Sequence, residues 1–187
     1  MRFIQWAGVV AALAGAVGIY IVFYRPRQLR WGATDQEVAR AMPGDEIVAR
    51  PVFNATRAVT VNARPEEIWP WLVQIGFGRA GWYSYDILDN LGRHSSEEIL
   101  PEYQHLAPGD LIPLGPGEAS GLYVKDIRPN ESMVWWERKR QATSWVWGLY
   151  PTGDGQTRLI TRCGTTIGKG SPTSCSASFS SNPPTSR

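Results

Sequence analysis

The sequence predicts an α+β domain that follows one membrane-spanning helix. Three observations lead to this prediction. An uncharged apolar run occupies the N-terminus from Phe3 to Tyr24. After residue 51, the expected order of elements is a strand, two short helices and a series of strands, which is typical of α+β proteins. Nine tryptophans in 187 residues, eight of them beyond the apolar run, indicate either a strongly aromatic core or an apolar site with few polar groups.

The run from Phe3 to Tyr24 is long enough to cross a bilayer. At about 1.5 Å per residue it makes a helix of roughly 33 Å, against a hydrocarbon core of ~30 Å. One arginine precedes the run and three follow it, so the positive-inside rule places the C-terminal domain in the cytoplasm. A secretory signal peptide is the alternative, but it would have a shorter apolar core followed by a small-residue cleavage site. We therefore expect residues 1–25 to be an uncleaved, single-pass anchor in the cell membrane.

Residues 26–51 are interpreted as a juxtamembrane linker. Pro26 ends the apolar helix, and Thr34 with Glu37 forms a capping box before a short helix expected at Asp35–Met42. The turn residues Pro43-Gly44-Asp45 end that helix. The folded domain is therefore expected over residues 52–163.

The domain begins with a strand expected at Thr56–Val61, where apolar and polar residues alternate. A helix follows from Pro65 to Gly76, with two acidic residues in its first turn, and Pro70 is expected to kink it. A second helix is expected around Tyr85–Leu91, and Ser96–Leu100 is a further helical candidate. The later strands are expected at Asp110–Leu114, Leu122–Ile127, Met133–Arg138, Thr143–Pro151 and Thr157–Arg162.

The segment Ala58–Leu72 (AVTVNARPEEIWPWL) resembles the opening of the START/Bet v 1-like superfamily, also described as SRPBCC or polyketide cyclase/dehydrase-like. The segments Gln74–Gly76, Gly81–Asp86 and Asn90-Leu91 are similar to a bacterial branch of it. The resemblance covers Arg30–Arg162. It implies a helix-grip fold, in which a curved antiparallel sheet wraps a long C-terminal helix and leaves an apolar cavity. It also implies lipids, sterols, polyketides or other apolar small molecules as ligands, while a minority of members catalyse cyclisation or dehydration.

The C-terminal segment departs from this pattern. The long helix should follow the last strand, yet 12 of the 17 residues from Ser171 to Arg187 are Ser, Thr or Pro, with no apolar stripe. We therefore expect the long helix to be missing and residues 164–187 to be a tail. A disordered tail and a frameshifted reading of the gene are both compatible with this composition.

Catalytic chemistry has few candidates in this sequence. Asp86 follows an aromatic cluster, where a carboxylate of raised pKa would suit proton transfer together with Tyr83 or Tyr85. The simpler interpretation is that Asp86 caps a helix, with Ser84 as the alternative cap. No catalytic residue is therefore assigned, and Asp86, Tyr83 and Tyr85 remain weak candidates.

Other polar residues give no stronger signal. His94, His105 and Glu137 would complete an enzyme site, but the two histidines lack metal-ligand spacing and are better explained as surface residues. The sequence indicates no metal site and no cofactor. The nearly balanced net charge of +2 gives no indication of a nucleic-acid partner.

The tryptophans carry the binding hypothesis. Side-chain alternation along a strand places Trp145 and Trp147 on one face of the sheet, and it sends Trp135 and Trp136 to opposite faces. Such a set lines an apolar cavity or simply packs the core, and the sequence leaves both open. The residues expected to bind ligand are Trp69, Trp82, Tyr85, Trp135, Trp145 and Trp147.

Three functions are compatible with these features. The first is a membrane-anchored domain that binds an apolar small molecule or lipid without catalysing a reaction. The second is an enzyme of the polyketide cyclase/dehydrase type that uses Asp86 with a neighbouring tyrosine. The third is a structural or partner-recruiting module that binds no small molecule.

Overall fold

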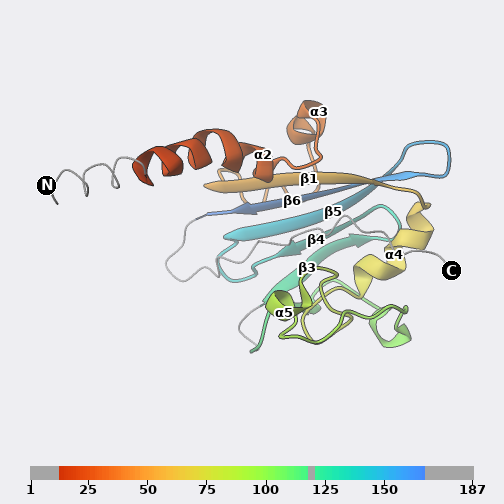
Figure 1. The fold of residues 1–187 in the computed structure, drawn as a ribbon. Coiled ribbons are helices and arrows are strands. Elements are labelled where there is room, and N and C mark those ends of the chain that lie inside the picture. The colour runs from red at the N-terminus through yellow and green to blue at the C-terminus, as the bar shows by residue number, and fades with distance from the viewer. Residues whose placement is uncertain (1–12, 118–120, 167–187) are drawn as a thin grey trace, which may run out of the picture.

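One six-stranded antiparallel sheet forms the centre of the protein. The structure is a computed structural model that describes residues 13–117 and 121–166. The strand order is β1-β6-β5-β4-β3-β2, so the first and last strands are neighbours and the others follow as hairpins (Figure 1). The strands are β1 (Phe53–Val61), β2 (Leu111–Pro113), β3 (Gly121–Arg128), β4 (Ser132–Trp136), β5 (Thr143–Pro151) and β6 (Thr157–Thr165).

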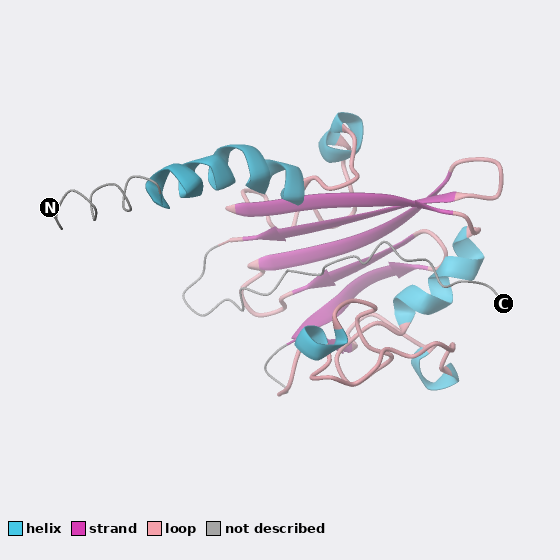
Figure 2. Ribbon diagram, in the orientation of Figure 1, coloured by secondary structure: helices cyan, strands magenta, loops and turns pink. Residues whose placement is uncertain are grey.

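Short helices flank this sheet, which makes the chain α+β as the sequence predicts (Figure 2). The α-helices are α2 (Arg25–Leu29), α3 (Asp35–Ala39), α4 (Pro65–Val73) and α5 (Asp86–Asp89), with a π-helical turn η1 (Tyr20–Tyr24) and a 3₁₀ turn η2 (Pro101–Tyr103).

Four helix predictions need correction. The N-terminal helix, expected to end at Pro26, continues to Leu29, and the helix expected at Pro65–Gly76 ends at Val73. The helix expected at Asp35–Met42 has the predicted capping box of Thr34 and Glu37, but it ends at Ala39 because Arg40 has an extended backbone. The candidate helix Ser96–Leu100 is absent, since the Leu100 N–H bonds to the buried side chain of Gln74 instead of to a helical carbonyl.

One face of the sheet carries Trp135, Trp145 and Trp147, and we call it the tryptophan face. Its buried core joins residues of β2–β6 with Ile68 and Leu72 of α4 and with Ile75 just beyond that helix, and β1 packs partly buried side chains against it. Helix α4 begins at Pro65, where a missing N–H costs nothing, and Glu67 accepts a hydrogen bond from the Arg64 N–H at 2.7 Å. The helix continues through Pro70 to Val73.

The opposite face, which we call the outer face, is covered by residues 31–52, named here the strap. Met42 of the strap is buried against Ala58, Val146 and Ile160. The predicted linker therefore contains residues that pack on the sheet, which its polar composition did not indicate.

Two arginines of β6 fasten the strap to the outer face. The Arg162 guanidinium, almost fully buried, donates to Thr56 Oγ1, to Asp45 Oδ2 at 2.7 Å, and to three carbonyl oxygens of residues 37, 38 and 40. Arg158 binds both carboxylate oxygens of Glu37, at 2.7 and 3.0 Å. Such planar two-point pairing suits arginine and fixes the position of the strap.

The Glu37–Arg158 pair predicts acid sensitivity. The hydrogen bond from Arg158 lowers the pKa of Glu37 from 4.5 to about 2. A depressed folded-state pKa contributes stability that is present above pH 4.5 and is lost as the pH falls towards 2. We expect the Glu37→Gln protein to lose less stability than the wild type between pH 5 and pH 2.5, measured by urea unfolding at both values. An equal loss in the two proteins would contradict this role of the pair.

The N-terminal helix runs through residues 13–29, and its apolar side chains are exposed. Within the described residues, no helix is both long enough and apolar enough to cross a bilayer. The predicted span begins in residues 1–12, outside the described part of the chain. The expected loss of the long C-terminal helix concerns residues 167–187, which also lie outside it. Both expectations stay predictions.

Candidate functional site: a tryptophan cluster

Four tryptophans gather on the tryptophan face. Trp135 of β4 faces Trp145 of β5 directly in the strand register, and Trp147 follows two residues later on the same side. Ring centroids in this trio lie 5.2–5.6 Å apart. Trp82 stacks on Trp145 with centroids 5.8 Å apart and an interplanar angle of 4°. Alternation along the strands places Trp145 and Trp147 on one face as the sequence predicts, and the strand register adds Trp135 to them.

Trp82 comes from a loop after α4, which glycines bring onto the sheet. Gly76, Gly78 and Gly81 all have positive φ, and a Cβ on Gly81 would lie 2.5 Å from Ser95 Oγ. The loop closes on itself through a bridge between Gly76 and Gly81 and bonds to β2 through the Phe77 N–H and the Pro113 carbonyl. This geometry seats Trp82 as a half-buried layer over Trp145.

The indole N–H groups of the cluster differ in their partners. Trp145 Nε1 donates a hydrogen bond to Thr161 Oγ1 at 2.7 Å, and the Thr161 hydroxyl in turn donates a hydrogen bond to the Val146 carbonyl. Trp135 has 0% of its surface exposed, and its Nε1 has no acceptor among the described residues. A buried donor without an acceptor costs about 1–3 kcal/mol. The cluster is therefore a largely buried apolar group in which the Trp135 N–H is an unsatisfied donor.

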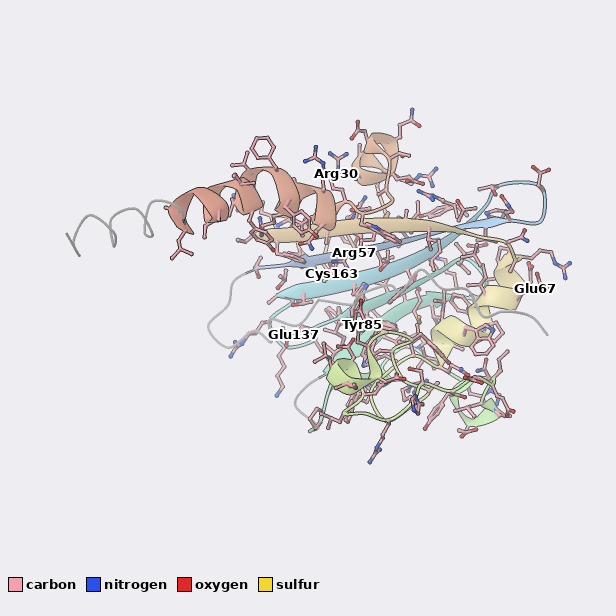
Figure 3. All side chains as sticks on the ribbon, viewed as in Figure 1. Arg30, Arg57, Glu67, Tyr85, Glu137 and Cys163 are labelled. Atoms are coloured by element: carbon pink, nitrogen blue, oxygen red, sulfur yellow. The ribbon has the colours of Figure 1, made fainter. Side chains whose placement is uncertain are left out.

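The other two expected binding residues lie apart from this cluster. Trp69 on α4 packs at the edge of the same core and is half-buried. Tyr85 is 61% exposed on the connection to α5 and lies beside that helix (Figure 3). Trp136 points to the outer face, where Lys125 lies 5.1 Å from its ring centroid, as alternation predicts.

The Gln74 side chain holds together Tyr83 and residues 98–104, a group that we call the wall, and the sequence did not predict this role. Its fully buried amide donates to the Tyr83 hydroxyl and to the Glu98 carbonyl, and it accepts from the Leu100 N–H and from Gln104. These partners lie up to 30 residues away in the chain, so no local pattern marks them. The only sequence signal is an amide inside an apolar helix end.

Tyr83 belongs to this wall through its hydrogen bond with Gln74. Burial raises the pKa of its hydroxyl, while the hydrogen bond from Gln74 opposes that shift. Its ring packs edge-on against Trp71 with centroids 5.9 Å apart. Tyr83 thus stays protonated and supports the loop.

Asp86 holds a loop together and does not sit in an apolar pocket. Its Oδ1 accepts from Ser95 Oγ at 2.8 Å, from the Ser95 N–H and from Asn90, and its Oδ2 lies 3.2 Å from His94 Nδ1. Desolvation acts to raise the pKa, but these hydrogen bonds outweigh it and the pKa of Asp86 falls below its ordinary value. The expected raised pKa is therefore wrong.

The expected helix caps are also absent. Tyr85 occupies the cap position of α5 without a side-chain cap, and Ser84 bonds instead to Asp89. Glu137 braces the β4–β5 turn by accepting the N–H groups of Lys139 and Arg140 at 2.9 and 2.7 Å. No three His, Cys, Asp or Glu side chains within the described residues are grouped to hold a metal ion.

Comparisons with known proteins return only structural neighbours. No protein-family model and no curated protein matches the sequence. Protein MLL2253 from Mesorhizobium loti is 16% identical, with 62% of this chain and 78% of that chain covered and a TM-score of 0.37. A protein from Thermobifida fusca is 14% identical (62% and 74% covered, TM-score 0.39). The Polyketide_cyc-like protein Cgl2372 from Corynebacterium glutamicum is 13% identical (60% and 65% covered, TM-score 0.35).

Proposed function

We propose that this chain is a membrane-tethered, helix-grip domain of the SRPBCC type that binds an apolar small molecule or lipid at the tryptophan cluster without catalysing a reaction. The resemblance of Ala58–Leu72 to the opening of that superfamily supports the family, and the order of one strand, then helices, then a series of antiparallel strands agrees with it. The apolar run from Phe3 to Tyr24 supports the tether, and the three arginines that follow it favour a cytoplasmic domain.

The buried indole N–H of Trp135 carries the proposal. A domain that only packs its core would gain by satisfying this donor or by placing phenylalanine there. Ligand sites combine apolar walls with a few placed polar groups, and the cluster has that composition. The expected ligand is therefore apolar and carries one hydrogen-bond acceptor, such as a carbonyl or ether oxygen.

Two neutral fluorescent probes test binding. Prodan has a ketone oxygen, and N-phenyl-1-naphthylamine has a similar apolar body without a strong acceptor. Full-length protein in lipid nanodiscs should transfer tryptophan excitation to both probes with saturation, after subtraction of empty nanodiscs. Transfer that rises only in proportion to probe concentration would favour a domain that binds no small molecule.

The enzyme alternative makes Asp86 part of the site. We expect the Asp86→Asn protein to bind Prodan with a dissociation constant within about twofold of the wild type, because Asp86 bonds only within its own loop. Its folding should be checked by near-ultraviolet circular dichroism. A loss of affinity beyond tenfold in a folded variant would move the site to Asp86 and favour the cyclase/dehydrase interpretation.

A further inference from the structure

Helix α5 and its flanks expose apolar side chains and bury polar ones. Tyr85, Ile87, Leu88 and Leu91 are 61%, 81%, 75% and 65% exposed, and we call these four residues the apolar tip. A soluble surface normally shows the reverse arrangement, and a cluster of exposed apolar residues marks an interaction site.

Hydrogen bonds between polar side chains hold the apolar tip with its apolar residues exposed. Asp86 and Asn90 bond to each other and to Ser95, and Asn90 is buried. Leu91 has a positive φ of 52°, which a leucine rarely adopts. The acidic groups of α5 are thus engaged within the loop, and the tip presents apolar surface outward.

The apolar tip lies near the end of the sheet where the turn between β4 and β5 is found. Trp82 stacks on Trp145, one residue pair from the last pair of β4 and β5, Trp136 with Ser144. Tyr85 follows Trp82 by three residues, which span at most about 10 Å. The next segment of the sheet beyond that last pair is the β4–β5 turn, Glu137–Ala142.

That turn is basic. Arg138, Lys139 and Arg140 are all exposed, and Arg93 is exposed two residues after Leu91. Glu137 accepts the N–H groups of Lys139 and Arg140, and the Arg138 guanidinium lies 5.8 Å from the centroid of the Tyr123 ring. The apolar tip is therefore accompanied by positive charge, which complements anionic lipid headgroups.

The N-terminal helix leaves the domain at the same end. Phe53 begins β1, pairs with Thr165 of β6, and Thr165 pairs with Thr143, the first residue of β5 beside the basic turn. Helix α2 lies against β1, and Figure 1 shows the N-terminal helix running outward past the start of that strand. An apolar tip, a basic turn and an apolar helix thus share one end of the molecule.

We propose that this end docks onto an anionic bilayer surface, with the apolar tip among the lipid headgroups and acyl chains and the basic turn against the phosphates. The inference rests on the proposed membrane tether and adds a second contact to it. Amphipathic surfaces bind bilayers through combined apolar burial and attraction to anionic lipid. Docking also places Trp82, the outer layer of the cluster, next to the membrane, so that an apolar ligand can pass between bilayer and domain.

Photo-crosslinking from the lipid tests this contact. Full-length protein is reconstituted in vesicles of phosphatidylcholine with 30% phosphatidylglycerol, and the phosphatidylcholine carries a diazirine in its acyl chain. Mass spectrometry should place crosslinks within residues 85–91 as well as in the N-terminal run. The double variant Arg138→Glu, Lys139→Glu should reduce the labelling of residues 85–91 roughly tenfold.

The matched control is Ile99→Ser, which removes an exposed apolar residue outside the apolar tip and should leave the labelling unchanged. Labelling of the N-terminal run without the tip would overturn the docking contact and leave the ligand proposal intact. Labelling of neither would overturn the tether and the contact together. Equal labelling of the tip in purely zwitterionic vesicles would overturn the role of the basic turn.

Discussion

Replacing Arg162 by alanine is expected to lower the free energy of unfolding by about 3–5 kcal/mol, because each of three partly buried carbonyl oxygens that lose this donor costs about 1–3 kcal/mol. Arg162 links the sheet to the strap, and only 8% of its side chain is exposed. Alanine would remove this donor from the carbonyl oxygens of residues 37, 38 and 40 and from the Asp45 carboxylate, which keeps the Met42 N–H at 2.8 Å. The strap would then lose its attachment to β6 at this point.

The measurement is urea unfolding followed by tryptophan fluorescence in the same detergent for all variants. Arg128→Ala is the matched control, because Arg128 pairs with Asp126 at the surface with 61% of its side chain exposed. That control should change the free energy of unfolding by no more than about 0.5 kcal/mol. A cost of less than about 1 kcal/mol for Arg162→Ala would show that the strap is held by other contacts.

The Trp135→Phe protein is expected to bind Prodan about three- to tenfold more weakly than the wild type. The phenyl ring keeps most of the apolar side chain and removes the Trp135 N–H donor, and a hydrogen bond contributes about 0.5–1.5 kcal/mol. The same variant should bind N-phenyl-1-naphthylamine nearly as well as the wild type, because that probe has no strong acceptor to lose. The contrast between the two probes separates the hydrogen bond from a general change in packing.

Trp136→Phe is the matched control for this comparison. It removes a neighbouring tryptophan whose ring lies on the outer face with Lys125, so both variants keep the same number of tryptophans. We expect its affinity for both probes to equal that of the wild type. Equal weakening by the two substitutions would mean that Prodan does not reach Trp135.

The strands could be predicted because their patterns are local. Thr143–Pro151 has the bounds of β5 as expected, and the alternation of Trp145, Val146 and Trp147 assigned each side chain to the right face. The strand expected to end at Arg162 continues to Thr165 because Gly164 and Thr165 pair with both neighbouring strands. Pairing across the sheet has no signature in the strand's own sequence.

The strap and the wall around Gln74 could not be predicted for the same physical reason. Arg162 meets Asp45 across 117 residues, and the Gln74 side chain meets Leu100 across 26. The sequence around Asp45 is typical of a linker, and the sequence around Gln74 is typical of the end of a helix. Asp86 shows the opposite problem, since its aromatic neighbours suggested an apolar pocket while Ser95, nine residues later, supplied the hydrogen bonds that lower its pKa.

The indole resonances of the cluster test the central claim most directly. Full-length protein labelled with ¹⁵N at tryptophan is reconstituted in nanodiscs, and Trp135→Phe and Trp145→Phe assign the two cross-peaks. Added Prodan should move the Trp135 indole proton downfield, because that donor gains an acceptor. The Trp145 proton, already bonded to Thr161, should not show such a hydrogen-bond shift. If the Trp135 cross-peak stays in place at saturating Prodan, the cluster is a packed core and the proposed binding site is wrong.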